Sequence, residues 1–143
     1  MAQQRIEVVQ AFPFSVEKLY AFLSEHENLG AIFPAKIKRV RDGQGSVNGV
    51  GSVRKIIMAP GLALEETVTK AEPNQLIEYT ITKGGWPIND HYGVMKFYPY
   101  EGGSRLHYTI DLGAALPGAA WVVKKALEGS IRSGLKKLAK DGI

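Results

Sequence analysis

Apolar and polar residues alternate near the start of the chain and through its middle, and change to a helical spacing near its end. Residues 5–12 alternate, which predicts a β-strand. Two short helices are expected after this strand, one over 16–24 with Ser15 as its N-cap, and one from about 28 to 33. The second ends there because Pro34 disfavours helical geometry in the residue before it.

The middle of the chain, residues 50–112, reads as strands separated by turn signals. No crossover helix fits between these strands, so they must form an antiparallel sheet. Residues 36–41 form a mixed segment whose facing the pattern does not assign. Residues 118–140 form an amphipathic helix. This order predicts an α+β fold in which a curved antiparallel sheet of about seven strands is covered on one face by the final helix.

The positions of the turns predict which residues face each other across the sheet. A symmetric turn at Ala59-Pro60-Gly61 sets Met58 opposite Leu62 and Arg54 opposite Glu66, and a two-residue turn at Pro73-Asn74 sets Val68 opposite Tyr79. A turn centred on Glu101 pairs Val94 with Tyr108. These turns select one inner face, made of Arg54, Ile56, Leu64, Glu66, Val68, Ile77, Tyr79, Ile81, Tyr92, Val94, Leu106, Tyr108 and Ile110.

Length and composition limit the classes of protein that fit. The 143 residues are enough for one domain spanning 1–143, and the absence of cysteine excludes thiol nucleophiles, disulfides and cysteine-based metal sites. With three histidines we expect neither a metal nor a cofactor. The first residues carry no apolar targeting segment and no stretch is long enough to span a membrane, so a cytoplasmic protein is expected.

The net charge of +4 lies entirely on the last segment of the chain. From Leu116 onward there are six basic and two acidic residues, while the rest of the chain holds twelve of each sign. A single basic helix face is typical of a solvated surface, because nucleic-acid binding usually needs a broad basic stripe with base-reading side chains. We therefore expect no nucleic acid as a partner.

Charged and phenolic side chains on the inner face are the candidate chemistry. Burying Arg54 or Glu66 alone is costly, so the two are expected to pair across their strands. They form either a self-sufficient ion pair or a polar anchor inside a cavity. Together with Tyr79, Tyr92 and Tyr108, and with Ile81 and Val94 as apolar lining, they have the composition of a small-molecule site.

The final helix adds Leu127 and Ile131 to this candidate lining. It also contains Gly129 and Gly134, which destabilise a helix by roughly 0.8–1 kcal/mol each relative to alanine. Gly134 lies on the apolar side, where a missing side chain allows either close packing or room for a ligand.

Catalytic constellations are poor in this sequence. His91 is placed opposite Asp111 on the outer side of the sheet, which is best interpreted as a surface pair. His107 falls on the same outer side, and His26 is expected in a polar loop. No catalytic residue is assigned from the pattern.

The whole pattern resembles the polyketide cyclase/dehydrase and lipid-transport family, in the superfamily of START domains, the major birch pollen allergen and the abscisic acid receptors. The resemblance covers nearly the whole chain, and it is carried by residues 12–20, 50–54, Glu66, 76–79 and Gly134-Leu135. It implies a helix-grip fold with a cavity between the sheet and the long helix. Leu62 and Trp86 would then lie where a ligand enters. The lysine that holds the hormone in the receptors has no match, so hormone reception is not expected.

Three functions fit these residues. The first is binding or transport of a small hydrophobic ligand, lipid-, steroid- or polyketide-like, with its polar group directed at Arg54 and the tyrosines. The second is an enzyme of the cyclase or hydratase kind, in which Glu66 or a tyrosine transfers a proton. The third is a structural or partner-binding protein with a filled interior. The sequence is compatible with a monomer or a homodimer.

Overall fold

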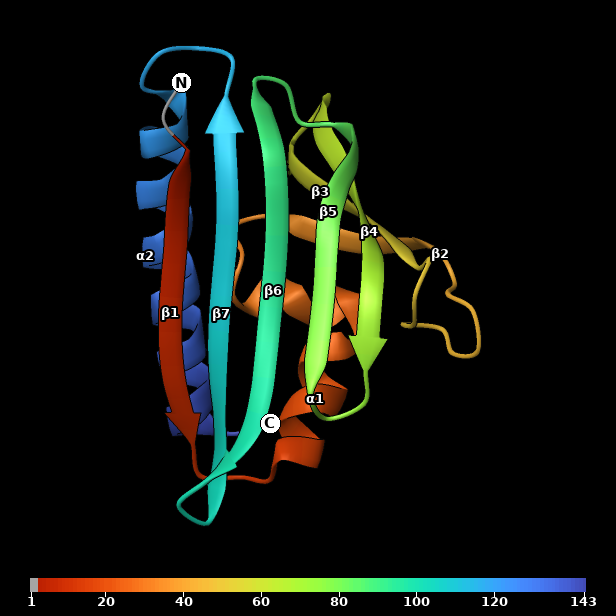
Figure 1. The fold of residues 1–143 in the computed structure, drawn as a ribbon, viewed down its shortest axis with the longest axis vertical. Coiled ribbons are helices and arrows are strands. Elements are labelled where there is room, and N and C mark those ends of the chain that lie inside the picture. The colour runs from red at the N-terminus through yellow and green to blue at the C-terminus, as the bar shows by residue number, and fades with distance from the viewer. Residues whose placement is uncertain (1–2) are drawn as a thin grey trace.

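The computed structural model describes residues 3–143 and shows a curved seven-stranded antiparallel sheet with a long helix along one side (Figure 1). The strand order is β1-β7-β6-β5-β4-β3-β2. The elements are β1 (Gln4–Phe12), α1 (Val16–Ser24), the 3₁₀ helix η1 (His26–Ala31), β2 (Lys36–Arg41), β3 (Val53–Ala59), β4 (Leu62–Glu72), β5 (Leu76–Gly84), β6 (Ile88–Tyr100), β7 (Gly103–Ala114) and α2 (Ala119–Asp141). The expected α+β helix-grip arrangement is confirmed.

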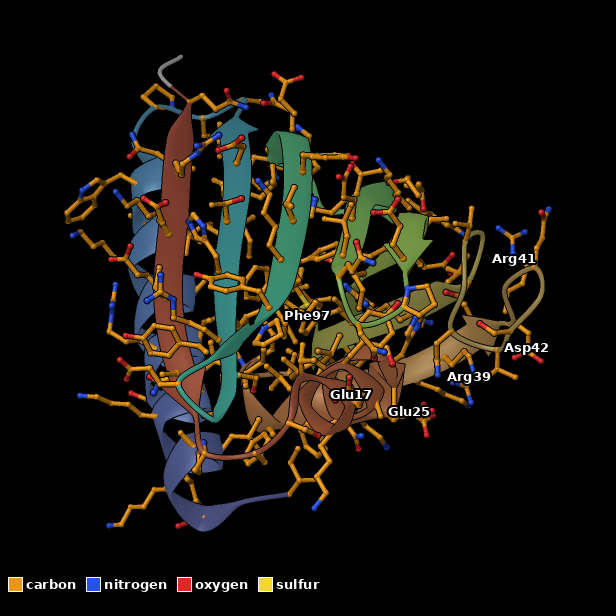
Figure 2. The ribbon with its side chains drawn as sticks, turned by 60° about the horizontal axis from the view of Figure 1, so that its bottom comes forward. Glu17, Glu25, Arg39, Arg41, Asp42 and Phe97 are labelled. Carbon is orange, nitrogen blue, oxygen red and sulfur yellow. The ribbon has the colours of Figure 1, made fainter. Side chains whose placement is uncertain are left out.

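The first helix begins and ends where the sequence predicts. The Ser15 hydroxyl accepts a hydrogen bond from the backbone N–H of Lys18 at 3.2 Å, which caps α1. The second short helix begins earlier than expected, at His26. Glu25 lies between the two helices and accepts a hydrogen bond of 2.8 Å from Arg39 on β2, so the helices are tied to this edge of the sheet (Figure 2).

Helix α2 packs mainly on β1 and β7. Its buried side chains include Ile131 and Leu135, neither of which is exposed. A Cβ at Gly134 would lie 2.7 Å from the backbone oxygen of Ala31, and the Ser130 hydroxyl donates a hydrogen bond to the carbonyl oxygen of Ile32 at 2.9 Å. Of the two roles left open for Gly134, the structure supports close packing of α2 against the end of η1.

The predicted pairings of β3, β4 and β5 hold through the inner face. Arg54 is paired with Glu66, Ile56 with Leu64, Val68 with Tyr79 and Glu66 with Ile81. The expected pair of Met58 with Leu62 is wrong, because a register shift before the turn places Ala59 opposite Leu62. The inner face of these three strands is therefore the predicted one.

The predicted facing of β6 is wrong by one residue. Met95, not Val94, is paired with Tyr108, and Gly93, not Tyr92, is paired with Ile110. The cause is the turn: Glu101 and Gly102 both have positive φ angles, 46° and 80°, and form a two-residue turn that places Tyr100 opposite Gly103. A shift of one residue turns every side chain to the other face. Tyr92 and Val94 therefore point outward.

Strands β5 and β6 share the shortest stretch of pairing in the meander. Their register pairs run only from Leu76–Lys96 to Tyr79–Gly93, whereas β6 and β7 are paired from Ile88 to Tyr100. Beyond Tyr79 the two strands diverge toward the connection that joins them.

Candidate functional site

An ion pair between neighbouring strands forms the polar centre of the inner face. Arg54 Nε on β3 donates a hydrogen bond to Glu66 Oε1 on β4 at 2.8 Å, and the two residues are opposite each other in the register. Only 3% of Arg54 and 6% of Glu66 is exposed. Both side chains thus lie inside the fold, as the turn at Ala59-Pro60-Gly61 predicts.

Two buried tyrosines lie beside this pair. The guanidinium carbon of Arg54 is 4.3 Å from the centroid of the Tyr79 ring, within the range of a cation–π interaction. The Tyr79 and Tyr108 hydroxyls are hydrogen-bonded to each other, and their rings meet edge to face. The Tyr79 ring fits because residue 93 is glycine: a Cβ there would lie 2.3 Å from the ring carbon Cζ.

His91 lies on the inner side of the sheet, because it has the same facing as Gly93 and Met95 on β6. The register shifts between Asn89 and Tyr92, where Asp90 has a φ angle of 50°. His91 Nδ1 accepts a hydrogen bond of 3.2 Å from the backbone N–H of Ile81, so the proton of the neutral ring is on Nε2. Nε2 lies 3.6 Å from Glu66 Oε2. Arg54, Glu66, Tyr79, His91 and Tyr108 are hereafter the buried polar cluster.

The predicted surface pair of His91 with Asp111 is wrong. Asp111 is held instead by Arg5 from β1, which donates two hydrogen bonds to its carboxylate at 2.7 and 2.9 Å. His107 does lie on the outer side, where its Nε2 is 2.6 Å from Glu7 Oε2.

Burial governs the protonation states of the cluster. Burial lowers the pKa of His91, and the nearby Glu66 carboxylate offsets this only in part. Burial raises the pKa of both Tyr79 and Tyr108. Burial also disfavours the charged form of Arg54, but Glu66 and the two tyrosines hold the pKa of its guanidinium above the usual value. At neutral pH the cluster therefore presents a charged guanidinium, with neutral imidazole and phenol groups around it.

Two buried nitrogens lack a hydrogen-bond partner among residues 3–143: Arg54 Nη2 and His26 Nδ1. His26 is only 1% exposed, so its expected place in a polar loop is wrong. Its Nε2 lies 3.1 Å from the buried Ser52 hydroxyl. Burial, with a smaller contribution from Arg54, lowers the pKa of His26 to about 4. Because a buried donor without an acceptor is costly, Arg54 Nη2 is suited to receive an acceptor atom.

The other predicted lining residues lie in four places: beside the cluster, on the outer face of the sheet, on α2 and at the end of the sheet. Ile81 lies opposite Glu66 and next to His91. Tyr92 and Val94 are on the outer face, where the Tyr92 hydroxyl donates a hydrogen bond to Glu78.

The predicted helix residues belong to the same hydrophobic core as Tyr79 and Tyr108, whereas the predicted rim residues are exposed. Leu127 is partly buried and Ile131 fully buried on α2, the helix that packs on β1 and β7. Leu62 and Trp86 are 56% and 73% exposed, at the end of the sheet where β3 meets β4 and β5 meets β6.

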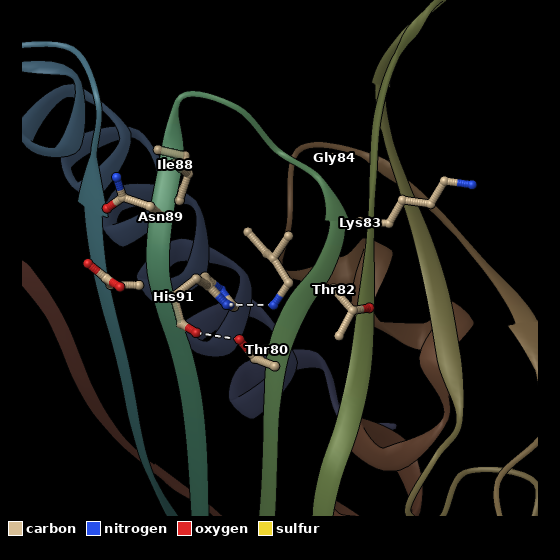
Figure 3. A pocket seen from close by; sticks show the side chains of 9 residues that line it. Thr80, Thr82, Lys83, Gly84, Ile88, Asn89 and His91 are labelled. Carbon is tan, nitrogen blue, oxygen red and sulfur yellow. Dashed lines mark hydrogen bonds between the residues drawn. The ribbon is translucent and has the colours of Figure 1, made fainter.

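A pocket of about 290 Å³ lies where β5 and β6 diverge (Figure 3). Thr80, Ile81 and His91 line it together with Thr82, Lys83, Gly84 and residues 88–90. The Thr80 hydroxyl donates a hydrogen bond of 2.5 Å to the His91 carbonyl oxygen. This pocket therefore reaches the two residues that border Glu66.

A second pocket, of about 350 Å³, is lined by residues around the β3–β4 turn and the end of β5, including Lys55, Ala63, Glu65 and Lys83. Neither pocket lies between the sheet and α2, where the resemblance implies a cavity.

Within residues 3–143, no group of three His, Asp or Glu side chains is arranged to hold a metal ion. In the same part of the chain, no helix has the length and apolar character needed to cross a bilayer.

The fold defines the chain as a helix-grip domain whose sheet carries a buried polar cluster. A family model described as polyketide cyclase / dehydrase and lipid transport matches residues 3–141, and the chain belongs to this family. No curated protein sequence matches it.

Solved structures share the fold at low sequence identity. A START superfamily protein from Mycobacterium smegmatis is 13% identical with a TM-score of 0.76, covering 96% of this chain and 97% of that one. Ara h 8.0201 is 16% identical with a TM-score of 0.70, covering 99% and 100%. A Thalictrum norcoclaurine synthase, solved with a transition-state analogue, is 14% identical with a TM-score of 0.68, covering 98% and 96%.

Proposed function

We propose that this protein binds a small, largely apolar molecule whose single polar oxygen is held by Arg54. The observation that carries this proposal is the buried guanidinium with a donor, Nη2, that no other group of the described chain accepts. A fold that needed only packing could fill the same volume with apolar side chains at no loss of stability.

The surroundings of Arg54 select the kind of ligand. Apolar residues dominate the interior, and burial keeps the tyrosines and His91 neutral. Among the buried residues of 3–143, Arg54 is therefore the one strong cationic partner for a carbonyl, carboxylate or phenolate oxygen. The pocket between β5 and β6 provides a starting point for access, because it already reaches His91 and Ile81. The rest of the ligand would be lipid-, steroid- or polyketide-like.

Displacement of a fluorescent hydrophobic probe, followed by native mass spectrometry of the bound compound, tests this proposal. The informative variant is Arg54→Met with Glu66→Leu, because removing both charges leaves no unpaired carboxylate and preserves volume. We expect it to fold and to lose at least roughly tenfold in affinity for ligands with an acceptor oxygen, since a charge-assisted hydrogen bond contributes about 1.5–3 kcal/mol. Arg5→Met on the outer face is the control. Equal affinity in both variants, or no uptake of any hydrophobic compound, would contradict the proposal.

The position of His91 supports a second candidate, an enzyme of the cyclase or hydratase kind. A neutral imidazole 3.6 Å from the Glu66 carboxylate is a second group able to exchange a proton inside the fold. In that case Glu66→Gln and His91→Gln would each retain ligand binding and lose turnover. A bound compound recovered chemically unchanged from the unmodified protein would argue for binding alone.

The third candidate, a structural protein with a filled interior, predicts the opposite pattern. The Arg54–Glu66 pair would then serve only itself, and the double variant would match the unmodified protein in every binding assay. This third candidate does not explain why Arg54 Nη2 is buried without a hydrogen-bond acceptor.

A further inference from the structure

Exposed apolar side chains gather at one end of the sheet. Because the strands form an antiparallel meander, the β3–β4 turn, the β5–β6 connection and the β7–α2 connection all lie at the same end (Figure 1). The backbone N–H of Ala115 donates a hydrogen bond of 2.8 Å to the Pro87 carbonyl oxygen, which joins two of these segments directly. The large apolar residues exposed here are Met58, Leu62, Trp86, Leu116, Trp121 and Val122, hereafter the apolar rim.

The apolar rim contains both tryptophans of the chain, Trp86 at 73% and Trp121 at 54% exposure. Isolated exposed apolar residues are common, but so many on three adjoining segments indicate a contact surface. The turns at the opposite end, around Pro73-Asn74 and Glu101-Gly102, contribute no exposed large apolar side chain. The rim is thus a property of one end of the molecule.

Lysines are interleaved with the apolar rim. Lys124 and Lys125 follow Trp121 on the first turns of α2, and Lys125 Nζ lies 5.8 Å from the Trp121 ring. Lys83 is the second-last residue of β5, just before the connection that carries Trp86. The carboxylates at this end include Glu65, Asp90 and Asp111. Glu65 lies opposite Lys55 and Lys83 in the register, and Asp111 is bound by Arg5. The rim is therefore bordered by net positive charge.

We propose that the apolar rim docks on the surface of an anionic lipid bilayer. Tryptophan prefers the boundary between hydrocarbon and headgroups, and lysines near it are attracted by anionic lipid. The lysines that border the rim favour an anionic lipid surface as the occupant, because they would meet its headgroups while the apolar side chains insert. The contact is peripheral: side chains from three loops and one helix end insert, and the fold stays outside the bilayer.

Co-sedimentation with vesicles tests this proposal. Vesicles of phosphatidylcholine with phosphatidylglycerol should retain the protein, and vesicles of phosphatidylcholine alone should retain much less. Replacing both lysines with Lys124→Glu and Lys125→Glu should weaken retention by roughly tenfold or more, since each basic residue near an anionic surface strengthens binding several-fold. The matched control is Lys136→Glu with Lys137→Glu, which makes the same change of charge in the C-terminal half of the same helix.

The apolar contribution is tested separately. Trp86→Ser should reduce retention, whereas Val9→Ser, which removes a half-exposed apolar residue from β1, should not. In a Trp121→Phe background the emission of Trp86 should shift to the blue on adding anionic vesicles.

Three outcomes would overturn docking on a bilayer. The first is no retention on either kind of vesicle. The second is an equal loss of retention in the two double lysine variants. The third is self-association of the free protein that Trp86→Ser abolishes. The last would identify the rim as a contact between copies of the chain.

Docking and internal ligand binding can fail independently. The Lys124→Glu and Lys125→Glu variant reports on the bilayer contact, and the Arg54→Met with Glu66→Leu variant reports on the interior. Loss of one response with the other intact distinguishes the two proposals.

Discussion

The hydroxyls of Tyr79 and Tyr108 satisfy each other in an interior that offers few other partners. Replacing either tyrosine with phenylalanine leaves the remaining hydroxyl without its hydrogen-bond partner. Each single variant should therefore lose about 1–3 kcal/mol of unfolding free energy. The double variant should lose clearly less than the sum of the two. Urea unfolding of the four proteins measures this coupling. Strict additivity would show that the two hydroxyls do not depend on each other.

His26 makes stability depend on pH. Its pKa of about 4 in the fold is below the ordinary value of 6.5, so folding favours the neutral ring. The stabilisation is fully present above pH 6.5 and is lost as the pH falls toward 4. The expected loss is about 2–3 kcal/mol. The lowered pKa of His91 acts in the same direction.

Unfolding free energy measured between pH 7 and 4 checks this dependence. His26→Gln should flatten the slope, with His107→Gln on the outer face as the control for removing a histidine. An unchanged slope in His26→Gln would contradict the assignment.

Single residues differ in how far the sequence could place them. Arg54 and Glu66 were predictable, because the turn at Ala59-Pro60-Gly61 leaves their pairing unaffected by the shift next to it. His26 was not, since its burial depends on Ser52 from a distant segment. His91 was misplaced for the same reason as Tyr92 and Val94: it shares the facing of Gly93 and Met95, so the two-residue turn at Glu101-Gly102 sets it on the inner side.

Helix α2 offers a direct comparison between two glycines five residues apart. A Cβ at Gly129 meets nothing within 4 Å, so Gly129→Ala should stabilise the protein by about 0.5–1 kcal/mol through helix propensity alone. A Cβ at Gly134 would collide with the backbone of Ala31 and Ile32 at 2.7 Å, so Gly134→Ala should destabilise it by about 1–3 kcal/mol. Thermal unfolding compares them. A change in stability of the same sign in both variants would mean that α2 does not approach η1 this closely.

In the hairpin of β6 and β7, the prediction found both strands but assigned the side chains of β6 to the wrong faces of the sheet. Both strands were predicted, and the signal that fixes their facing, Glu101-Gly102 as a two-residue turn, was present in the sequence. The prediction instead centred the turn on Glu101, which pairs Val94 with Tyr108. The turn geometry determines the facing of β6, because two successive positive φ angles match the twist of the strands that they join.

The divergence of β5 and β6 should make this part of the sheet the first to open. Amide hydrogens of residues 82–84 should exchange faster than those of β7, because this part of β5 has no register partners on β6. Hydrogen exchange followed by mass spectrometry checks this order. A ligand that enters through the pocket at His91 should slow exchange there, and uniform exchange across β5, β6 and β7 would contradict a local opening.

For the whole molecule, the order of elements alone determined the architecture. A strand, two short helices, a meander and an amphipathic helix leave few ways to bury every apolar face, and the resemblance carried by short motifs agreed with them. The cavity expected beneath α2 could not be predicted from the order of the elements. Cavities depend on side-chain volumes at sites such as Gly134, which the sequence left open between packing and ligand space.

The outermost strand β2 also affects how copies of the protein meet. Four of its six residues are lysine or arginine, and β3 occupies only one of its two sides. A second copy that tried to add its own β2 there would bring two rows of cations together. Electrostatic repulsion thus opposes pairing of the β2 strands of two molecules. Concentrated solutions of the protein should therefore not form fibres through this edge strand.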